Sequence, residues 1–159
     1  MIEISHEIHT LNGLIAHLID SIDAYVAAAE EPQAGRLGEM FRARADERRI
    51  VVGNLQAEVA RLGGEPEEYG TLLARAHRTF LKLKAAVAGN DPRAIINEVE
   101  RGEDHIKARF ETALADEELS FSVKSAIRTG YSSVRDGHDQ MSDLKRAPEA
   151  QARSVVGAM

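Results

Sequence analysis

The chain has 159 residues, 43% of them hydrophobic and 29% charged, a balance typical of one folded domain rather than of a disordered segment. A formal net charge of −6, with no long cluster of lysine and arginine, argues against nucleic-acid binding, which depends on neutralising phosphates. Cysteine is absent and no apolar run approaches the ~20 residues of a membrane span, which excludes disulfides, thiolate chemistry and a membrane partner.

Two long helices are expected in the first part of the chain from the spacing of apolar residues and from the breaks between them. The first runs from Ser5 to about Glu30, with apolar residues at three- and four-residue spacing. Pro32 fits the first turn of the second helix, which runs to Leu62 and stops at two glycines. The break at Glu31-Pro32 predicts that the first and second helices are neighbours joined by a tight turn.

Three further helices are expected in the rest of the chain. The third covers about 72–88, the fourth opens at Asp91-Pro92, and the fifth runs from about 117 to 146 with Asp116 as its cap. No segment shows the alternating pattern of a strand, and short connections place consecutive helices antiparallel. The sequence therefore predicts an all-α, antiparallel up-down bundle in one domain over 1–146, followed by a flexible tail over 147–159.

Charged residues fall inside the apolar stripes when each helix is drawn at about 100° per residue. Arg44 and Arg48 lie at the centre of the stripe of the second helix, and Glu47 lies at its border. On the fourth helix Glu103 lies inside the stripe and Glu100 towards one margin. Because an unpaired buried charge is too costly to persist, these groups are expected to pair with one another or with an ion.

Two interpretations of this interior compete. The first is a buried ionic layer that fixes the helix register, made of Arg44, Arg48, Glu100 and Glu103. The second is an iron or manganese site made of Glu47, Glu103 and Asp23, because carboxylates on facing helices bind such ions in ferritin-like bundles. That site needs Glu-x-x-His on two helices, but Ile50 and Ile106 stand where the imidazoles would be, and the two arginines would repel a cation. We therefore favour the ionic layer.

The six histidines do not supply the missing ligands. Four of them are expected on faces of their helices away from the apolar stripe: His6, His9, His17 and His105. His77 and His138 fall at stripe borders, where a histidine more often hydrogen-bonds a neighbouring carboxylate or backbone group than binds a metal.

Several segments, in this order, carry a resemblance to a known group: Leu11-Asn12-Gly13-Leu14-Ile15, Arg61-Leu62-Gly63-Gly64-Glu65-Pro66-Glu67 and Glu98-Val99-Glu100-Arg101-Gly102-Glu103-Asp104. Over about residues 8 to 115 the chain resembles small bacterial ferritin-like four-helix-bundle proteins that are catalogued as a domain of unknown function. The resemblance implies a four-helix core over about 5–115, with the helix at 117–146 added to it. It implies no activity, and the ferritin-like metal pattern, carried over to this chain, falls on Glu47 and Glu103 alone.

The first hypothesis for function is a non-catalytic bundle protein that self-associates as a homo-oligomer or binds another protein, with a role under stress and no resident cofactor. Its first residues have neither the basic nor the apolar part of a secretory signal, so we expect it in the cytoplasm. The alternative is a carboxylate-based, di-iron type oxidoreductase or iron-handling protein that uses iron or manganese. The arginines inside the bundle favour the first hypothesis.

Overall fold

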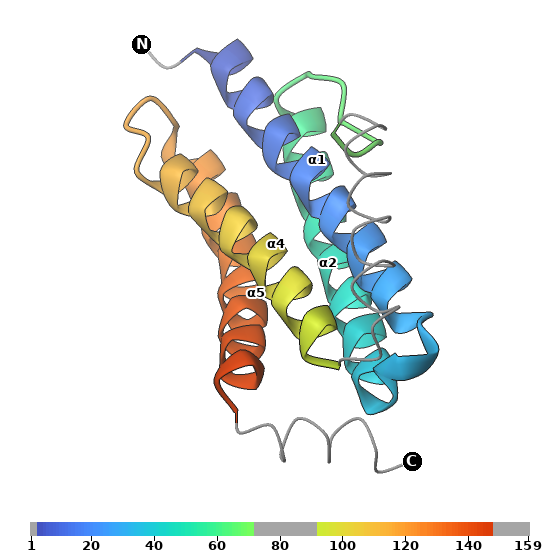
Figure 1. The fold of residues 1–159 in the computed structure, drawn as a ribbon. Coiled ribbons are helices and arrows are strands. Elements are labelled where there is room, and N and C mark those ends of the chain that lie inside the picture. The colour runs from blue at the N-terminus through green and yellow to red at the C-terminus, as the bar shows by residue number, and fades with distance from the viewer. Residues whose placement is uncertain (1–2, 72–91, 148–159) are drawn as a thin grey trace.

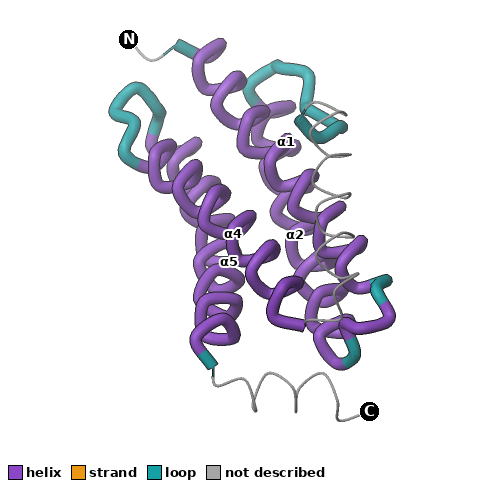
Figure 2. The backbone as a smooth tube through the Cα atoms, viewed as in Figure 1, coloured by secondary structure: helices purple, strands orange, loops and turns teal. Residues whose placement is uncertain are grey.

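The computed structural model describes residues 3–71 and 92–147. Over these ranges the chain forms four long helices, α1 (Ile4–Ala29), α2 (Arg36–Arg61), α4 (Pro92–Leu114) and α5 (Phe121–Arg146), and a short 3₁₀ helix, η1 (Pro32–Ala34) (Figure 1). The described ranges contain no strand (Figure 2), which confirms the predicted all-α class for them. The helix expected over 72–88, and all but the first residue of the expected tail, lie outside the described residues.

The four described helices enclose one core. α1 packs against α2 and α4, and α5 packs against α4 and α2, so the contacts close into a ring. Figure 1 shows that the chain reverses direction from α1 to α2 and again from α4 to α5. None of the helices in the described ranges has both the length and the apolar character needed to cross a membrane.

α5 is one of the four described helices around this core. Six of its seven buried residues recur at alternating spacings of four and three, with Ser133 beside them: Val123, Ile127, Gly130, Val134, Gly137 and Met141. This spacing keeps one face of a helix against its neighbours along the whole length. α5 therefore buries a continuous stripe against α2 and α4, and the bundle of described helices is not closed without it.

The core is mostly aliphatic, with a few aromatic rings between the layers. Leu11, Ile15 and Leu18 of α1 are fully buried. Each side chain of this size contributes about 1.5–3 kcal/mol when it leaves water. The rings of Tyr25 and Phe41 pack with centroids 5.7 Å apart and join α1 to α2. Burial of this kind, spread along all four helices, holds the bundle together.

Two helix starts differ from the sequence-based prediction. α2 begins at Arg36 rather than Pro32, because Gly35, with φ 56° and ψ −128°, ends the turn of η1 and redirects the chain. α5 begins at Phe121, where the Ser120 hydroxyl accepts a hydrogen bond from the backbone N–H of Val123 at 3.3 Å. Asp116, the expected cap of α5, lies in the connection before it and binds His6 instead.

The turn after α2 is fastened to α1 by its glycines and by one asparagine. Gly63 has a φ of +85°, which reverses the chain, and a Cβ on Gly64 would come within 2.8 Å of Ile8 on α1. The Asn12 side chain hydrogen-bonds the backbone of residues 65–67 twice, at 3.0 and 2.8 Å. Two of the segments that carry the resemblance therefore meet at one end of the bundle.

Candidate functional site

A complete ion pair is buried between α2 and α4. Arg48 is 0% exposed and Glu103 is 1% exposed. The two terminal nitrogens of Arg48 donate to the two oxygens of Glu103, at 3.0 Å for Nη1 to Oε1 and 2.6 Å for Nη2 to Oε2. Nη1 also donates to the Ser21 hydroxyl of α1 at 2.8 Å. This parallel geometry is the strongest that arginine and a carboxylate form, and it offsets the cost of removing both charges from water. We call Ser21, Arg48 and Glu103 the ionic clasp.

α5 completes the surroundings of the clasp with a glycine. A Cβ built on Gly137 would lie 2.5 Å from Nη2 of Arg48 and 2.7 Å from Oε2 of Glu103. Real Cβ atoms do not approach other atoms so closely, so only glycine lets α5 pack at this point. The clasp therefore contacts all four described helices at one level of the bundle.

Tyr25 lies beside the clasp with a buried hydroxyl. Its ring centroid is 5.7 Å from the Arg48 guanidinium carbon, within the range of a cation–π contact. Burial raises the pKa of Tyr25 well above its ordinary value, and the negative charge of Glu103 raises it further, while Arg48 opposes the shift. Within the described residues, neither the Tyr25 hydroxyl nor Nε of Arg48 has a hydrogen-bond partner. Tyr25 is therefore a neutral phenol beside the clasp.

The remaining residues of the expected ionic layer have partners of their own. Arg44 is partly buried and donates to both oxygens of Glu47 at 3.1 Å and to the side-chain oxygen of Gln140 at 2.8 Å. Glu100 accepts from Nζ of Lys145 at 3.1 Å. The structure therefore brings Arg48 and Glu103 together, and it gives Arg44 and Glu100 other partners.

The residues expected for an iron or manganese site are not gathered in the structure. Both oxygens of Glu103 are used by Arg48, Glu47 is half-exposed beside Arg44, and Asp23 is exposed. Among the described residues, the carboxylate and imidazole groups close enough to share an ion do not include these three. This donor set, with a guanidinium at its centre, does not fit a ferritin-type metal centre.

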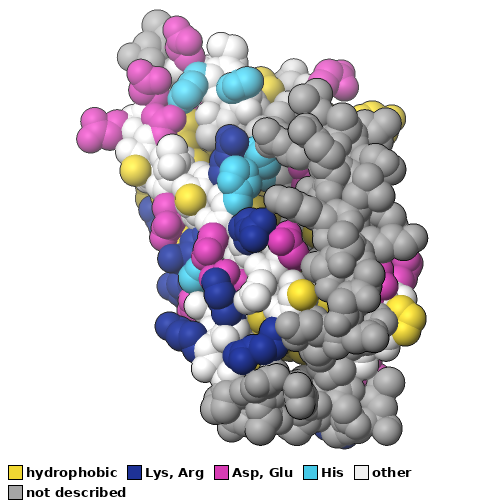
Figure 3. Space-filling view, in the orientation of Figure 1, with side chains coloured by type: hydrophobic (Ala, Val, Ile, Leu, Met, Phe, Trp, Pro, Cys, Tyr) yellow, Lys and Arg dark blue, Asp and Glu magenta, His cyan; other side chains and the backbone are white. Residues whose placement is uncertain are grey.

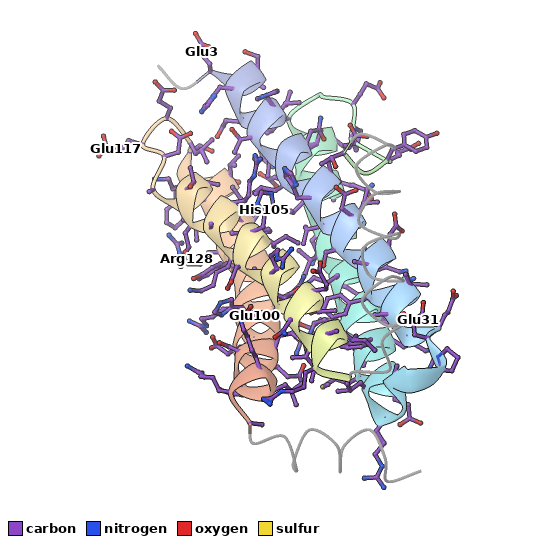
Figure 4. All side chains as sticks on the ribbon, viewed as in Figure 1. Glu3, Glu31, Glu100, His105, Glu117 and Arg128 are labelled. Atoms are coloured by element: carbon purple, nitrogen blue, oxygen red, sulfur yellow. The ribbon has the colours of Figure 1, made fainter. Side chains whose placement is uncertain are left out.

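His17 is buried, although helical spacing puts it on the polar side of α1. It packs edge-on against His105 of α4, with ring centroids 5.1 Å apart. The difference arises because α1 is covered on two sides, by α2 and by α4, so its buried face is wider than its apolar stripe. Figure 4 labels His105 on α4. In the same orientation, Figure 3 shows histidine, basic and acidic side chains on the face of the molecule that is turned to the viewer.

A cavity of about 310 Å³ lies between α1 and α4, next to the clasp. Its walls include Ser21 and Tyr25 from α1, and Glu103 and His105 from α4. Sequence reasoning did not single out Ser21 or the Tyr25 hydroxyl. The signal was available, because Ser21 lies three residues after Leu18 and four before Tyr25, on the same buried face of α1.

Comparison with known proteins gives a family without an assigned activity. A family model described as a domain of unknown function (DUF2383) matches residues 6–116. The match covers α1, α2 and α4, and with them all three residues of the clasp, but it ends before α5. No curated protein matches the chain. Because the match covers well over half of its length, the chain belongs to the DUF2383 family of domains of unknown function.

Proposed function

We propose that this chain is a non-catalytic, cytoplasmic bundle of the ferritin-like kind that acts by associating with a second protein chain, in the first place with its own copy. The clasp supports the first part of the proposal. It ties Glu103, a carboxylate of the alternative metal site, to Arg48 through both oxygens. The charged groups of the clasp are thereby committed to holding helices, which supports a function carried by the surface.

The observation that carries the association is an exposed apolar pair at one end of the bundle. Phe121 is 83% exposed and Ile4 is 53% exposed. They lie at the same end because the first turn of α1 contacts the α4–α5 connection, where Glu7 accepts from the backbone N–H of Ser120 at 2.7 Å. We call Ile4 and Phe121 the end surface. These two large exposed apolar residues form the core of the proposed interface.

Exposed acidic residues lie at the same end of the bundle as the end surface. Glu3 and Glu117 are labelled at this end in Figure 4, and both are exposed, as is Glu118. In a pair of identical chains these carboxylates would repel one another, and salt would screen the repulsion. Association with a copy should therefore strengthen as salt is added, whereas association with a basic partner should weaken.

Sedimentation over a concentration series tests this proposal. We expect wild type to self-associate more strongly at about 0.5 M than at about 0.05 M salt, where the Debye length is several times longer. We expect Phe121→Ser to stay monomeric and Ile50→Ser, which removes an exposed apolar residue from the middle of α2, to behave as wild type. Monomeric wild type at every concentration and both salt levels would contradict self-association.

The alternative function is iron or manganese chemistry at Glu47, Glu103 and Asp23. Metal analysis of protein purified without chelator, together with aerobic titration with Fe(II), tests it. Stoichiometric metal that is lost in Asp23→Ala, together with Fe(II) oxidation, would favour this alternative. Asp23 is the informative position because it is exposed, so its replacement leaves the clasp and the fold unchanged.

A further inference from the structure

A second group of ligand-type side chains lies between α4 and α5, outside the clasp. Glu100 and Asp104 are one turn apart on α4, and His138 faces them from α5. One ligand atom from each of the three lies within 4.8 Å of the others, and Nε2 of His138 is 2.6 Å from Oδ1 of Asp104. Figure 4 labels Glu100 where α4 runs beside α5. Atoms at this spacing need only small side-chain rotations to meet one ion at bond lengths of about 2.0–2.2 Å.

The imidazole of His138 is oriented by a carboxylate on its other side. Nδ1 lies 3.2 Å from Oδ1 of Asp139. The contact with Asp104 is a hydrogen bond in which Nε2–H donates to the carboxylate, so a metal ion at Nε2 would displace this proton while Nδ1–H donates to Asp139. Metal-binding histidines are held by the same second contact, which fixes the ring and makes it more basic.

A cation already occupies part of this group. Glu100 is only 7% exposed. Its Oε2 lies 3.1 Å from Nζ of Lys145, whose side chain is half-exposed. Lys145 is the partner of Glu100, whereas Asp104 and Asp139 both contact His138, so the group combines three carboxylates with one ammonium and one imidazole. Lys145 can turn out to solvent, and a divalent ion that replaced it would meet a buried carboxylate, a second carboxylate and an imidazole.

We propose that Glu100, Asp104 and His138 form a binding site for a divalent first-row transition metal, with water completing the coordination. One imidazole with two carboxylates suits Zn²⁺ or Mn²⁺, whereas Ca²⁺ and Mg²⁺ prefer oxygen alone. The site bridges α4 and α5, so a bound ion ties the helix outside the family match to one within it. It does not depend on the end surface and uses none of the residues of the clasp.

The chain offers a matched control. His6, Asp116 and Glu118 form a second group with ligand atoms within the same 4.8 Å. It has the same ligand types but contains no buried carboxylate, and Glu118 is exposed. If any histidine beside two carboxylates sufficed, this group would bind as well.

Isothermal titration of the full chain with Zn²⁺, followed by Co²⁺ absorption, tests the site. We expect one Zn²⁺ per chain, at least tenfold weaker binding in His138→Gln and about tenfold weaker binding in Asp139→Asn. We expect His6→Gln to bind as wild type, and Ca²⁺ or Mg²⁺ not to compete at tenfold excess. Both histidines are partly exposed, so the variants should fold, which circular dichroism checks. Undiminished binding in His138→Gln, loss in His6→Gln, or equal affinity for Ca²⁺ would overturn the proposal.

Discussion

Arg48 is stable inside the bundle because each of its terminal nitrogens meets an oxygen in a favourable direction. Burial would lower the pKa of Arg48, but the charge and hydrogen bonds of Glu103 outweigh it, so the pKa of Arg48 rises above its ordinary value. The guanidinium therefore stays charged although it is buried, and the ion pair with Glu103 is kept. The stability of the clasp depends on how the two terminal nitrogens of Arg48 are placed against the oxygens of Glu103 and Ser21.

Gly137 and Gly102 make a direct comparison at the residue scale. Alanine is favoured over glycine in a helix by about 1 kcal/mol, so Gly102→Ala, with open space around its Cβ, should raise the free energy of unfolding. Gly137→Ala should instead lower it by about 1–3 kcal/mol, because the new methyl overlaps Arg48 and Glu103. Urea titration measures both. A Gly137→Ala variant as stable as Gly102→Ala would show that α5 does not pack tightly on the clasp.

At the scale of elements, hydrogen bonds from α1 and from the first turn of α5 hold the connection between α4 and α5. Ser120 caps α5 through its hydroxyl, and its backbone N–H donates to Glu7 of α1. His6 of α1 lies 2.7 Å from Asp116 in the same connection. These contacts set where α5 starts and fix the end of α1 against it.

Ser120→Ala should therefore destabilise α5 from its first turn. Loss of a capping hydroxyl costs about 1 kcal/mol. Amide hydrogen exchange should show faster exchange at Val123, whose N–H loses its acceptor, with little change at the far end of α5. Ser125→Ala, on the exposed side of the same helix, serves as the control. Equal exchange at Val123 in both variants would contradict this assignment of the cap.

The contact between His6 and Asp116 predicts a pH dependence. The hydrogen bond to Asp116 raises the pKa of His6, so its stabilisation is complete below the ordinary value of 6.5 and is lost as pH rises through the raised pKa. The same bond lowers the pKa of Asp116, so that part is complete above 3.8 and is lost as pH falls through the lowered pKa. The melting temperatures of wild type and His6→Gln should differ most between these two values. A difference that grows above pH 8 would contradict the pairing.

Helix positions were largely predictable because they depend on local signals. Pro92 marks the start of α4 and the glycines after Arg61 mark the end of α2, and both signals lie within a few residues of the boundary. The start of α5 was misplaced because Asp116 and Ser120 are both good caps by type, and only the contact with His6 separates them. The place of α5 in the ring depends on contacts between distant segments, which periodicity does not give.

For the clasp, the sequence predicts which residues face the interior but not which of them pair. Helical spacing puts Arg44 and Arg48 on one face, one turn apart, so it cannot tell which of them meets Glu103. That choice depends on how α2 and α4 are rotated and on the glycine that α5 presents at position 137. His17 shows the same limit, since its burial comes from a second neighbour of α1 rather than from its own pattern.

At the scale of the whole molecule, the clasp joins elements far apart in the sequence. Ser21, Arg48 and Glu103 come from three helices, and Gly137 brings the fourth into contact with them. Paired burial of this kind fixes the relative rotation of helices whose aliphatic faces alone would allow other arrangements. The clasp therefore specifies how the four described helices are arranged around the core.

A double-mutant cycle on Arg48 and Glu103, measured by urea unfolding, tests this central claim most directly. Arg48→Met and Glu103→Leu should each lower the free energy of unfolding by about 3–5 kcal/mol, because each leaves a buried charge without its partner. The double variant should be much more stable than the sum of the two losses predicts, because no unpaired charge remains. Arg49→Ala, in an exposed pair on the same helix, should change stability by less than about 1 kcal/mol. Single variants that unfold at the wild-type midpoint, or losses that simply add, would contradict a buried clasp.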